Sequence, residues 1–130
     1  MSGIWLIVAS FFGVTGVGAG AYGWHSLSEN DPVRQIFMMG VNYQMWHALA
    51  LLGVAWVASQ ATFMTSKLPL LAGLAFSLGI IFFSGSLYLY AMSGYIIVKG
   101  AAPLGGWFMM AGWLSLMVCG WKSRRTNVVS

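Results

Sequence analysis

The chain has 130 residues, of which 59% are hydrophobic and only 6% are charged. Soluble globular domains carry about a quarter charged residues, so this composition excludes an ordinary soluble domain and indicates an integral membrane protein. The formal net charge of +4 comes mainly from a short basic cluster near the carboxyl end, which suits anionic lipid headgroups and gives no indication of nucleic-acid binding.

The six basic and two acidic residues separate four long uncharged runs, which cover residues 1–28, 35–66, 68–98 and 100–121. Each run exceeds the roughly 20 apolar residues that cross a bilayer as a helix. We therefore expect one domain over residues 1–130, with transmembrane helices near residues 4–24, 32–59, 68–92 and 103–121. Because short connections favour antiparallel neighbours, the predicted fold class is all-α, an integral membrane four-helix up-down bundle.

The first predicted helix carries small residues along one face, a pattern that lets membrane helices approach closely. The stripe consists of Ala9, Gly13, Gly16, Gly20 and Gly23. Residues 19–21 also resemble the small-residue cleavage site of a signal peptide. However, the amino end lacks Lys and Arg, and the apolar run is longer than a signal peptide needs, so we expect this helix to be retained.

The second predicted helix begins at Pro32, after the favourable N-cap Asp31, and places His47 close to the middle of the membrane. Tyr43 and Gln44 share its helix face. We expect a neutral His47 in an interhelical hydrogen-bond network with Gln44, Ser84 or Tyr88. Binding of a ligand or cofactor stays open as the alternative, since ionisable groups at this depth are costly.

Pro69 and Pro103 mark the starts of the third and fourth predicted helices, because proline is tolerated in a first helical turn. Small residues again predict close packing inside the bundle, at Gly73 on the third helix and at Gly105 and Gly112 on the fourth. The tryptophans near the helix ends are expected to anchor in the headgroup zone. Trp113, with Trp46 and Trp56, lies nearer the span interiors and is expected to face lipid or to pack.

The sequence does not indicate a metal centre or a cofactor. His25 and His47 lie at different depths, by roughly 10 to 15 Å from the helical rise, so they are not expected to share a haem iron. Copper binding by the nine methionines is disfavoured, since no Met-x-x-Met repeat occurs. We predict no cofactor and no metal, and we read the methionines as apolar packing residues.

Catalysis and transport also lack their usual residues. No Asp, Glu, Lys or Arg lies in the membrane-embedded part of the four predicted spans, whereas proton pumps and ion-coupled carriers generally place carboxylates there. No combination of nucleophile, base and orienting acid follows from the spacings, so we do not expect an enzyme. A channel would require oligomerisation to provide a continuous polar path.

The distribution of Lys and Arg predicts the orientation, since basic flanks stay on the cytoplasmic side. With four crossings, the basic residues on the side of the termini are Lys67, Lys122, Arg124 and Arg125, whereas Arg34 and Lys99 lie on the opposite side. We expect both termini in the cytoplasm.

Four ordered motifs resemble the YgdD-like family, a group of small bacterial inner-membrane proteins of unknown function with mitochondrial relatives. The motifs are GAYGWH at 20–25, YQMWHALA at 43–50, FSGSLY at 83–88, and PLGG at 103–106 with GW at 112–113. Trp24 departs from the small residue usual before the first histidine. The resemblance implies a location in the bacterial inner membrane, and it implies a shared polar cluster of Tyr22, His25, Tyr43, Gln44, His47, Ser84 and Tyr88.

These observations favour a non-catalytic membrane protein that serves as an accessory or stabilising subunit of a larger membrane complex, or that assembles with further copies of itself. The competing hypothesis is a membrane protein that binds a small ligand or a metal through the polar cluster around His25 and His47.

Overall fold

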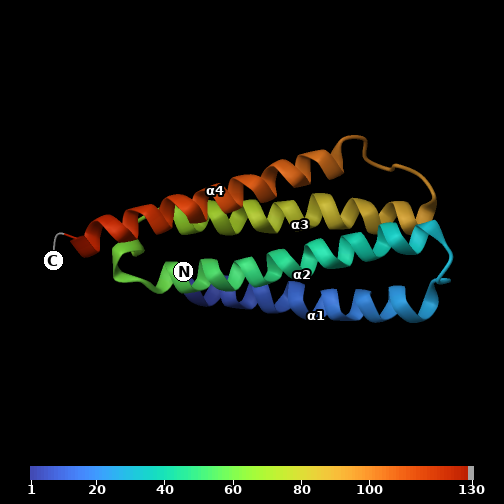
Figure 1. Ribbon diagram of the computed structural model, residues 1–130, viewed down its shortest axis with the longest axis horizontal. Helices are drawn as coiled ribbons and strands as arrows, with labels where there is room; N and C mark the ends of the chain where they lie inside the picture. The colour runs from blue at the N-terminus through green and yellow to red at the C-terminus, as the bar shows by residue number, and fades with distance from the viewer. Residues whose placement is uncertain (129–130) are drawn as a thin grey trace.

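The computed structural model describes residues 1–128 and contains four long helices in an up-down arrangement (Figure 1). They are α1 (Ser2–Ser26), α2 (Pro32–Ser59), α3 (Leu68–Ser93) and α4 (Ala101–Val128), with a short 3₁₀ helix, η1 (Ala61–Phe63), after α2. Successive helices run antiparallel, so α1 begins and α4 ends towards the same end of the bundle. The predicted all-α membrane bundle is confirmed.

The helix starts follow local chemistry. The Asp31 side chain accepts a hydrogen bond from the Val33 backbone N–H at 2.9 Å and caps α2, whose bounds coincide with the predicted ones. Pro69 is the second residue of α3, and Pro103 is the third residue of α4. Gly94 ends α3 with a φ of 77°, a left-handed conformation that glycine adopts without strain.

The first and last predicted helices are shorter than the observed ones. The structure extends α1 by two residues at each end and begins α4 two residues before Pro103. The larger difference is at the carboxyl end of α4, which continues seven residues beyond Trp121. This segment contains no proline or glycine, and its positively charged side chains interact favourably with the carboxyl end of a helix. The helix therefore continues past the apolar segment.

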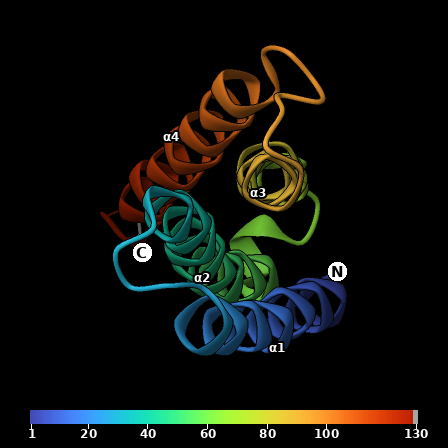
Figure 2. The same ribbon diagram turned by 90° about the vertical axis from the view of Figure 1, so that its right-hand side faces the viewer.

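The helices pack in chain order, α1 on α2, α2 on α3 and α3 on α4, while α4 touches α2 only locally. In Figure 2, α1 and α4 lie on opposite sides of α2. A buried cluster joins the helices around Leu51 and Val54 of α2 and Phe76 of α3, each with 0% of its surface exposed. Helix α2 is therefore the most enclosed element of the bundle.

Three helices, α1, α3 and the Ala101–Arg125 part of α4, are long and apolar enough to cross a membrane. Helix α2 is as long as α4, but its most apolar stretch is less hydrophobic than those of these three helices, because it carries polar residues such as Asn42, Gln44 and His47. Of these, Gln44 and His47 are buried against neighbouring helices. Part of the lower hydropathy of this stretch thus comes from side chains that lie inside the bundle.

Candidate functional site

Gln44, on the buried face of α2, connects three helices. Its Nε2 atom donates to the Phe12 carbonyl oxygen and to the Thr15 hydroxyl oxygen of α1, both at 2.9 Å. Its Oε1 atom accepts the Tyr88 hydroxyl of α3 at 2.7 Å. Only 5% of the Gln44 surface is exposed, so groups of α1 and α3 take the place of water as its hydrogen-bond partners.

Close approach of α1 to this amide depends on Gly16. A Cβ atom at Gly16 would lie 2.5 Å from Met45 Sδ and 3.3 Å from Gln44 Nε2. Gly20 and Gly23 face Val41 and Phe37 of α2 in the same manner. The small face of α1 therefore brings the Phe12 carbonyl and the Thr15 hydroxyl within hydrogen-bonding distance of α2.

His47 lies one turn after Gln44 and connects α2 to α4. Trp113 Nε1 donates to His47 Nε2 at 3.2 Å, and His47 Nδ1 lies 2.7 Å from the Tyr43 carbonyl oxygen. An indole N–H can only donate and a carbonyl oxygen can only accept. This pattern places the imidazole proton on Nδ1 and leaves Nε2 as the acceptor, so both ring nitrogens of a neutral His47 are occupied within the chain.

Aromatic rings surround this pair of polar residues. The Tyr43 ring lies 4.5 Å from the Phe83 ring, and Phe76 lies 5.6 Å from His47 and 5.2 Å from Trp113, measured between ring centroids. Such contacts exclude water and favour the hydrogen-bonded arrangement.

The other residues of the predicted polar cluster take no part in these hydrogen bonds. Ser84 is fully buried one turn before Tyr88, and its hydroxyl has no hydrogen-bond partner within residues 1–128. Tyr22 is 45% exposed and reaches Tyr88 only through the Phe37 ring, which lies between them. His25 is exposed in the last turn of α1. The structure thus brings together Tyr43, Gln44, His47, Ser84 and Tyr88, with Tyr22 at the edge and His25 apart.

Several partners in the site were not expected from the sequence. His47 bonds with Trp113 and the Tyr43 backbone, whereas the predicted partners were Gln44, Ser84 or Tyr88. Thr15, which receives a bond from Gln44, was not singled out, although it lies next to Gly16 on α1. Trp113 was expected to face lipid or pack, and half of its surface is indeed exposed, but its indole N–H turns inward.

Most small residues predicted to pack do lie between helices. Ala9 is 3% exposed, and added Cβ atoms at Gly73 and Gly112 would collide with the rings of Trp5 and Phe76. At Gly105 the collision would be with the Phe83 backbone. Gly13 differs from the prediction, since a Cβ there would meet no atom within 4 Å. It lies at the edge of the buried face of α1, which is formed by residues such as Trp5, Phe12 and Gly16.

The chemistry of the cluster is that of a buried hydrogen-bond network. Its amide and imidazole use their donors and acceptors within the chain, and aromatic rings pack around the imidazole. Within residues 1–128, no three His, Cys, Asp or Glu side chains gather where they could hold a metal ion.

The family model described as "Protein of unknown function (DUF423)" matches residues 19–106. The chain belongs to the DUF423 family. The matched segment includes Gln44, His47 and Tyr88, whereas their partners Thr15 and Trp113 lie outside it.

Curated relatives cover nearly the whole chain. The UPF0382 inner membrane protein YgdD of Escherichia coli is 34% identical over 95% of this chain and 93% of its own length. The UPF0382 membrane protein YwdK of Bacillus subtilis is 33% identical over 92% and 97%, and SH2409 of Staphylococcus haemolyticus is 32% identical over 92% and 96%. No solved structure matches. The resemblance to YgdD-like proteins is confirmed, and this helical DUF423 protein is a membrane protein like its relatives.

Proposed function

We propose that the protein is a non-catalytic accessory subunit that stabilises a larger assembly in the bacterial plasma membrane. The proposal rests on the contrast between the interior of the bundle, where polar side chains bond within the chain, and its surface, where large apolar side chains are exposed. Gln44 and His47 use their polar atoms to join helices of the same chain. Large apolar side chains on all four helices remain exposed, among them Ile7, Trp56, Ile81 and Trp121. Such a surface offers contact with lipid and with other membrane helices.

Open small residues on the surface support a role in helix contact. Gly18 on α1 and Gly106 on α4 are positions where an added Cβ would meet no atom within 4 Å. Val14 and Val17, near Gly18, are 69% and 62% exposed. Small residues beside apolar ones allow a second helix to approach closely, so α1 and α4 are the faces on which we expect a partner protein or a second copy.

The proposal includes four membrane crossings with both termini in the cytoplasm. Helix α2 has 28 residues, enough to cross, and it lies antiparallel to α1 and α3. Its buried polar residues are bonded inside the protein, which lowers the cost of placing them in the membrane.

The experiment is gentle extraction of the tagged protein from its own membranes, followed by native mass spectrometry. We expect a stoichiometric partner protein or a defined oligomer. Gly18→Leu and Gly106→Leu should each keep the fold, and one of them should sharply lower recovery of the partner. Recovery of only the monomer, from the wild type and from both variants, would contradict the proposal.

The competing role, binding of a small ligand or metal through His25 and His47, requires these residues to be available. In the structure His47 has both nitrogens occupied, and His25 lies at the end of another helix. The geometry therefore favours the structural role for His47.

A further inference from the structure

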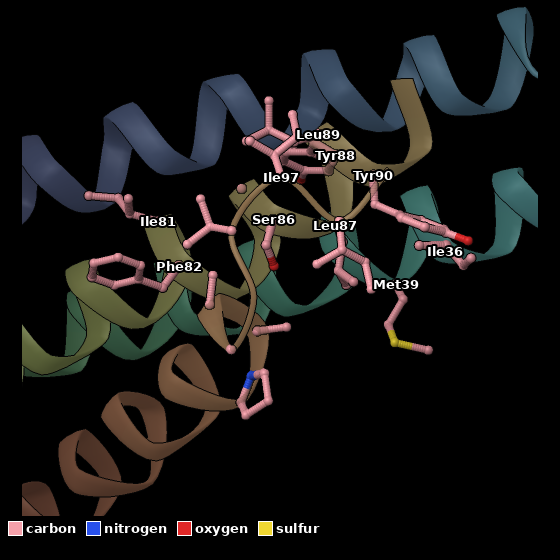
Figure 3. A pocket seen from close by; sticks show the side chains of 17 residues that line it. Ile36, Met39, Ile81, Phe82, Ser86, Leu87, Tyr88, Leu89, Tyr90 and Ile97 are labelled. Carbon is pink, nitrogen blue, oxygen red and sulfur yellow. The ribbon is translucent and has the colours of Figure 1, made fainter. Parts of the chain in front are cut away.

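A cavity of about 990 Å³ lies at the distal end of the bundle, defined here as the end away from the termini, where residues 27–31 and 94–100 connect the helices. Its walls come from the first turns of α2, the second half of α3, the α3–α4 connection and the start of α4 (Figure 3). This size matches pockets that hold a cofactor or a drug-sized molecule. We call it the distal cavity.

The walls of the distal cavity are almost entirely apolar. They include Ile36 and Met39 of α2, Ile81 and Phe82 of α3, and Ile97 of the connection. Three wall residues carry a hydroxyl, and two of these hydroxyls are donated within the protein, from Ser86 to the Phe83 carbonyl oxygen and from Tyr88 to Gln44 Oε1; the third belongs to Tyr90. The cavity therefore favours a hydrocarbon chain over a polar solute.

The α3–α4 connection is itself unusual for a non-helical segment, because Tyr95, Ile96, Ile97 and Val98 are all between 55% and 74% exposed. Four successive large apolar side chains in a connection indicate contact with the hydrocarbon or interfacial zone of the bilayer. The cavity beneath this connection thus opens where lipid chains are available.

Charge at the edge of the cavity favours one class of lipid. Lys99 is exposed and lies between Val98 and Gly100, both of which line the cavity. The acidic residues of this end, Glu29 and Asp31, belong to the α1–α2 connection, which lies on a different side of the end face (Figure 2). An ammonium group beside an apolar cavity at a membrane surface is complementary to a negatively charged headgroup.

We propose that the distal cavity binds one acyl chain of an anionic phospholipid, with the lipid headgroup against Lys99. The cavity borders the Gln44 network through Tyr88, which lines the cavity and donates to Gln44, and the proposed binding does not depend on any partner protein. A bound lipid would fill the space between α2, α3 and the start of α4, which the α3–α4 connection does not fill.

Glycines provide matched variants for the chain-binding part. Gly85 lines the cavity, and a Cβ there would meet no atom within 4 Å, so Gly85→Leu should fill the cavity without disturbing helix packing. Gly53 on α2 is equally open but does not line the cavity, so Gly53→Leu is the control. Lys99→Gln removes the proposed headgroup contact, and Lys67→Gln, in the α2–α3 connection, is its control.

The test incubates the full-length protein in mild detergent with an equimolar mixture of phosphatidylglycerol and phosphatidylcholine of identical chains, and counts retained lipids by native mass spectrometry. We expect one retained lipid per chain, with phosphatidylglycerol preferred about fivefold through the lysine. Gly85→Leu should lower retention about tenfold, since leucine takes the place of about two methylene groups of the lipid. Lys99→Gln should abolish the headgroup preference.

Thermal unfolding of each variant must show that the fold is kept, and the Gly53→Leu and Lys67→Gln controls should retain lipid like the wild type. Equal retention by Gly85→Leu and Gly53→Leu would overturn the proposal, as would equal retention of the two lipids by the wild type. Displacement of the lipid by inorganic phosphate alone would also overturn it, because the acyl chain would then contribute nothing. Failure to find a partner protein would leave these outcomes unchanged.

Discussion

Gln44 and His47, one turn apart on α2, direct their hydrogen bonds to different helices. Gln44 bonds with Phe12 and Thr15 of α1 and with Tyr88 of α3, and His47 accepts from Trp113 of α4. Two polar side chains thus connect α2 to every other long helix. Hydrogen bonds carry specificity that apolar packing between membrane helices does not supply.

Replacing Gln44 tests this role. Gln44→Leu keeps the side-chain volume but removes three interhelical hydrogen bonds and leaves the half-buried Tyr88 hydroxyl without its acceptor. We expect a loss of about 2 kcal/mol in the free energy of unfolding, measured by reversible denaturation in micelles. Asn42, exposed on the same helix, provides the control, because Asn42→Leu should be neutral or stabilising in lipid. Equal effects of the two substitutions would show that the network contributes nothing specific.

The contact between His47 and Trp113 predicts a spectroscopic signal. Trp113→Phe removes the N–H that donates to His47 Nε2, and we expect unfolding to become easier by about 0.5–1 kcal/mol. In ¹⁵N NMR, the Nε2 resonance of His47 should report an unprotonated acceptor in the wild type and should shift in the variant. Trp107→Phe, at an exposed tryptophan of the same helix, should leave the resonance in place. An Nε2 that carries the proton in the wild type would contradict the assigned tautomer.

The sequence predicted the centre of this network and the participation of Tyr88, but not the other partners. A histidine and a glutamine on one face of a long apolar helix cannot be left facing lipid without cost, so their burial follows from helical periodicity. The partners depend on the rotation of α1 and α4 about their axes, which residue spacing does not determine. The acceptor at Phe12 is a backbone carbonyl, which every residue has, so the sequence cannot single it out. Trp113 cannot be distinguished by residue type from the lipid-facing tryptophans of the chain.

At the scale of the helices, prolines and glycines explain most of what could be predicted. Pro32, Pro69 and Pro103 all lie within first turns, because each lacks the N–H that a helix interior requires. Small residues identified the α3–α4 contact through Gly105 and Gly112. The carboxyl end of α4 could not be predicted from hydropathy, because a helix can continue into water when its residues favour it. The cavity under residues 96–98 could not be predicted either, because the sequence pattern does not determine the path of a connection.

Adjacent glycines on α4 allow a direct test of helix packing. A Cβ at Gly105 would collide with the Phe83 backbone, which cannot move aside as a side chain can, whereas one at Gly106 would meet no atom within 4 Å. We expect Gly105→Ala to destabilise the protein by about 2 kcal/mol through separation of α3 and α4. Gly106→Ala should stabilise it by up to about 1 kcal/mol through helix propensity. Thermal unfolding in detergent measures both, and similar midpoints would exclude tight packing at Gly105.

At the scale of the whole molecule, the number of membrane crossings depends on whether α2 crosses. Hydropathy alone identifies three helices that could cross the membrane, whereas the antiparallel bundle contains four long helices of similar length. The difference arises because hydropathy averages over all side chains, while the membrane contacts only those on the outside. Gln44 and His47 lower the average but are 5% exposed. A polar helix enclosed by apolar neighbours can cross a membrane that it would not enter alone.

Labelling from one side of the membrane tests the number of crossings and the orientation together. In a Cys119→Ala background, Ser28→Cys lies in the α1–α2 connection and Ser66→Cys in the α2–α3 connection. Four crossings with cytoplasmic termini predict that a membrane-impermeant maleimide labels Ser28→Cys in intact cells, and labels Ser66→Cys only after permeabilisation. The reverse pattern would keep four crossings but invert the orientation. Labelling of both positions from one side would mean that α2 does not cross, and the buried network would then have to form outside the hydrocarbon core.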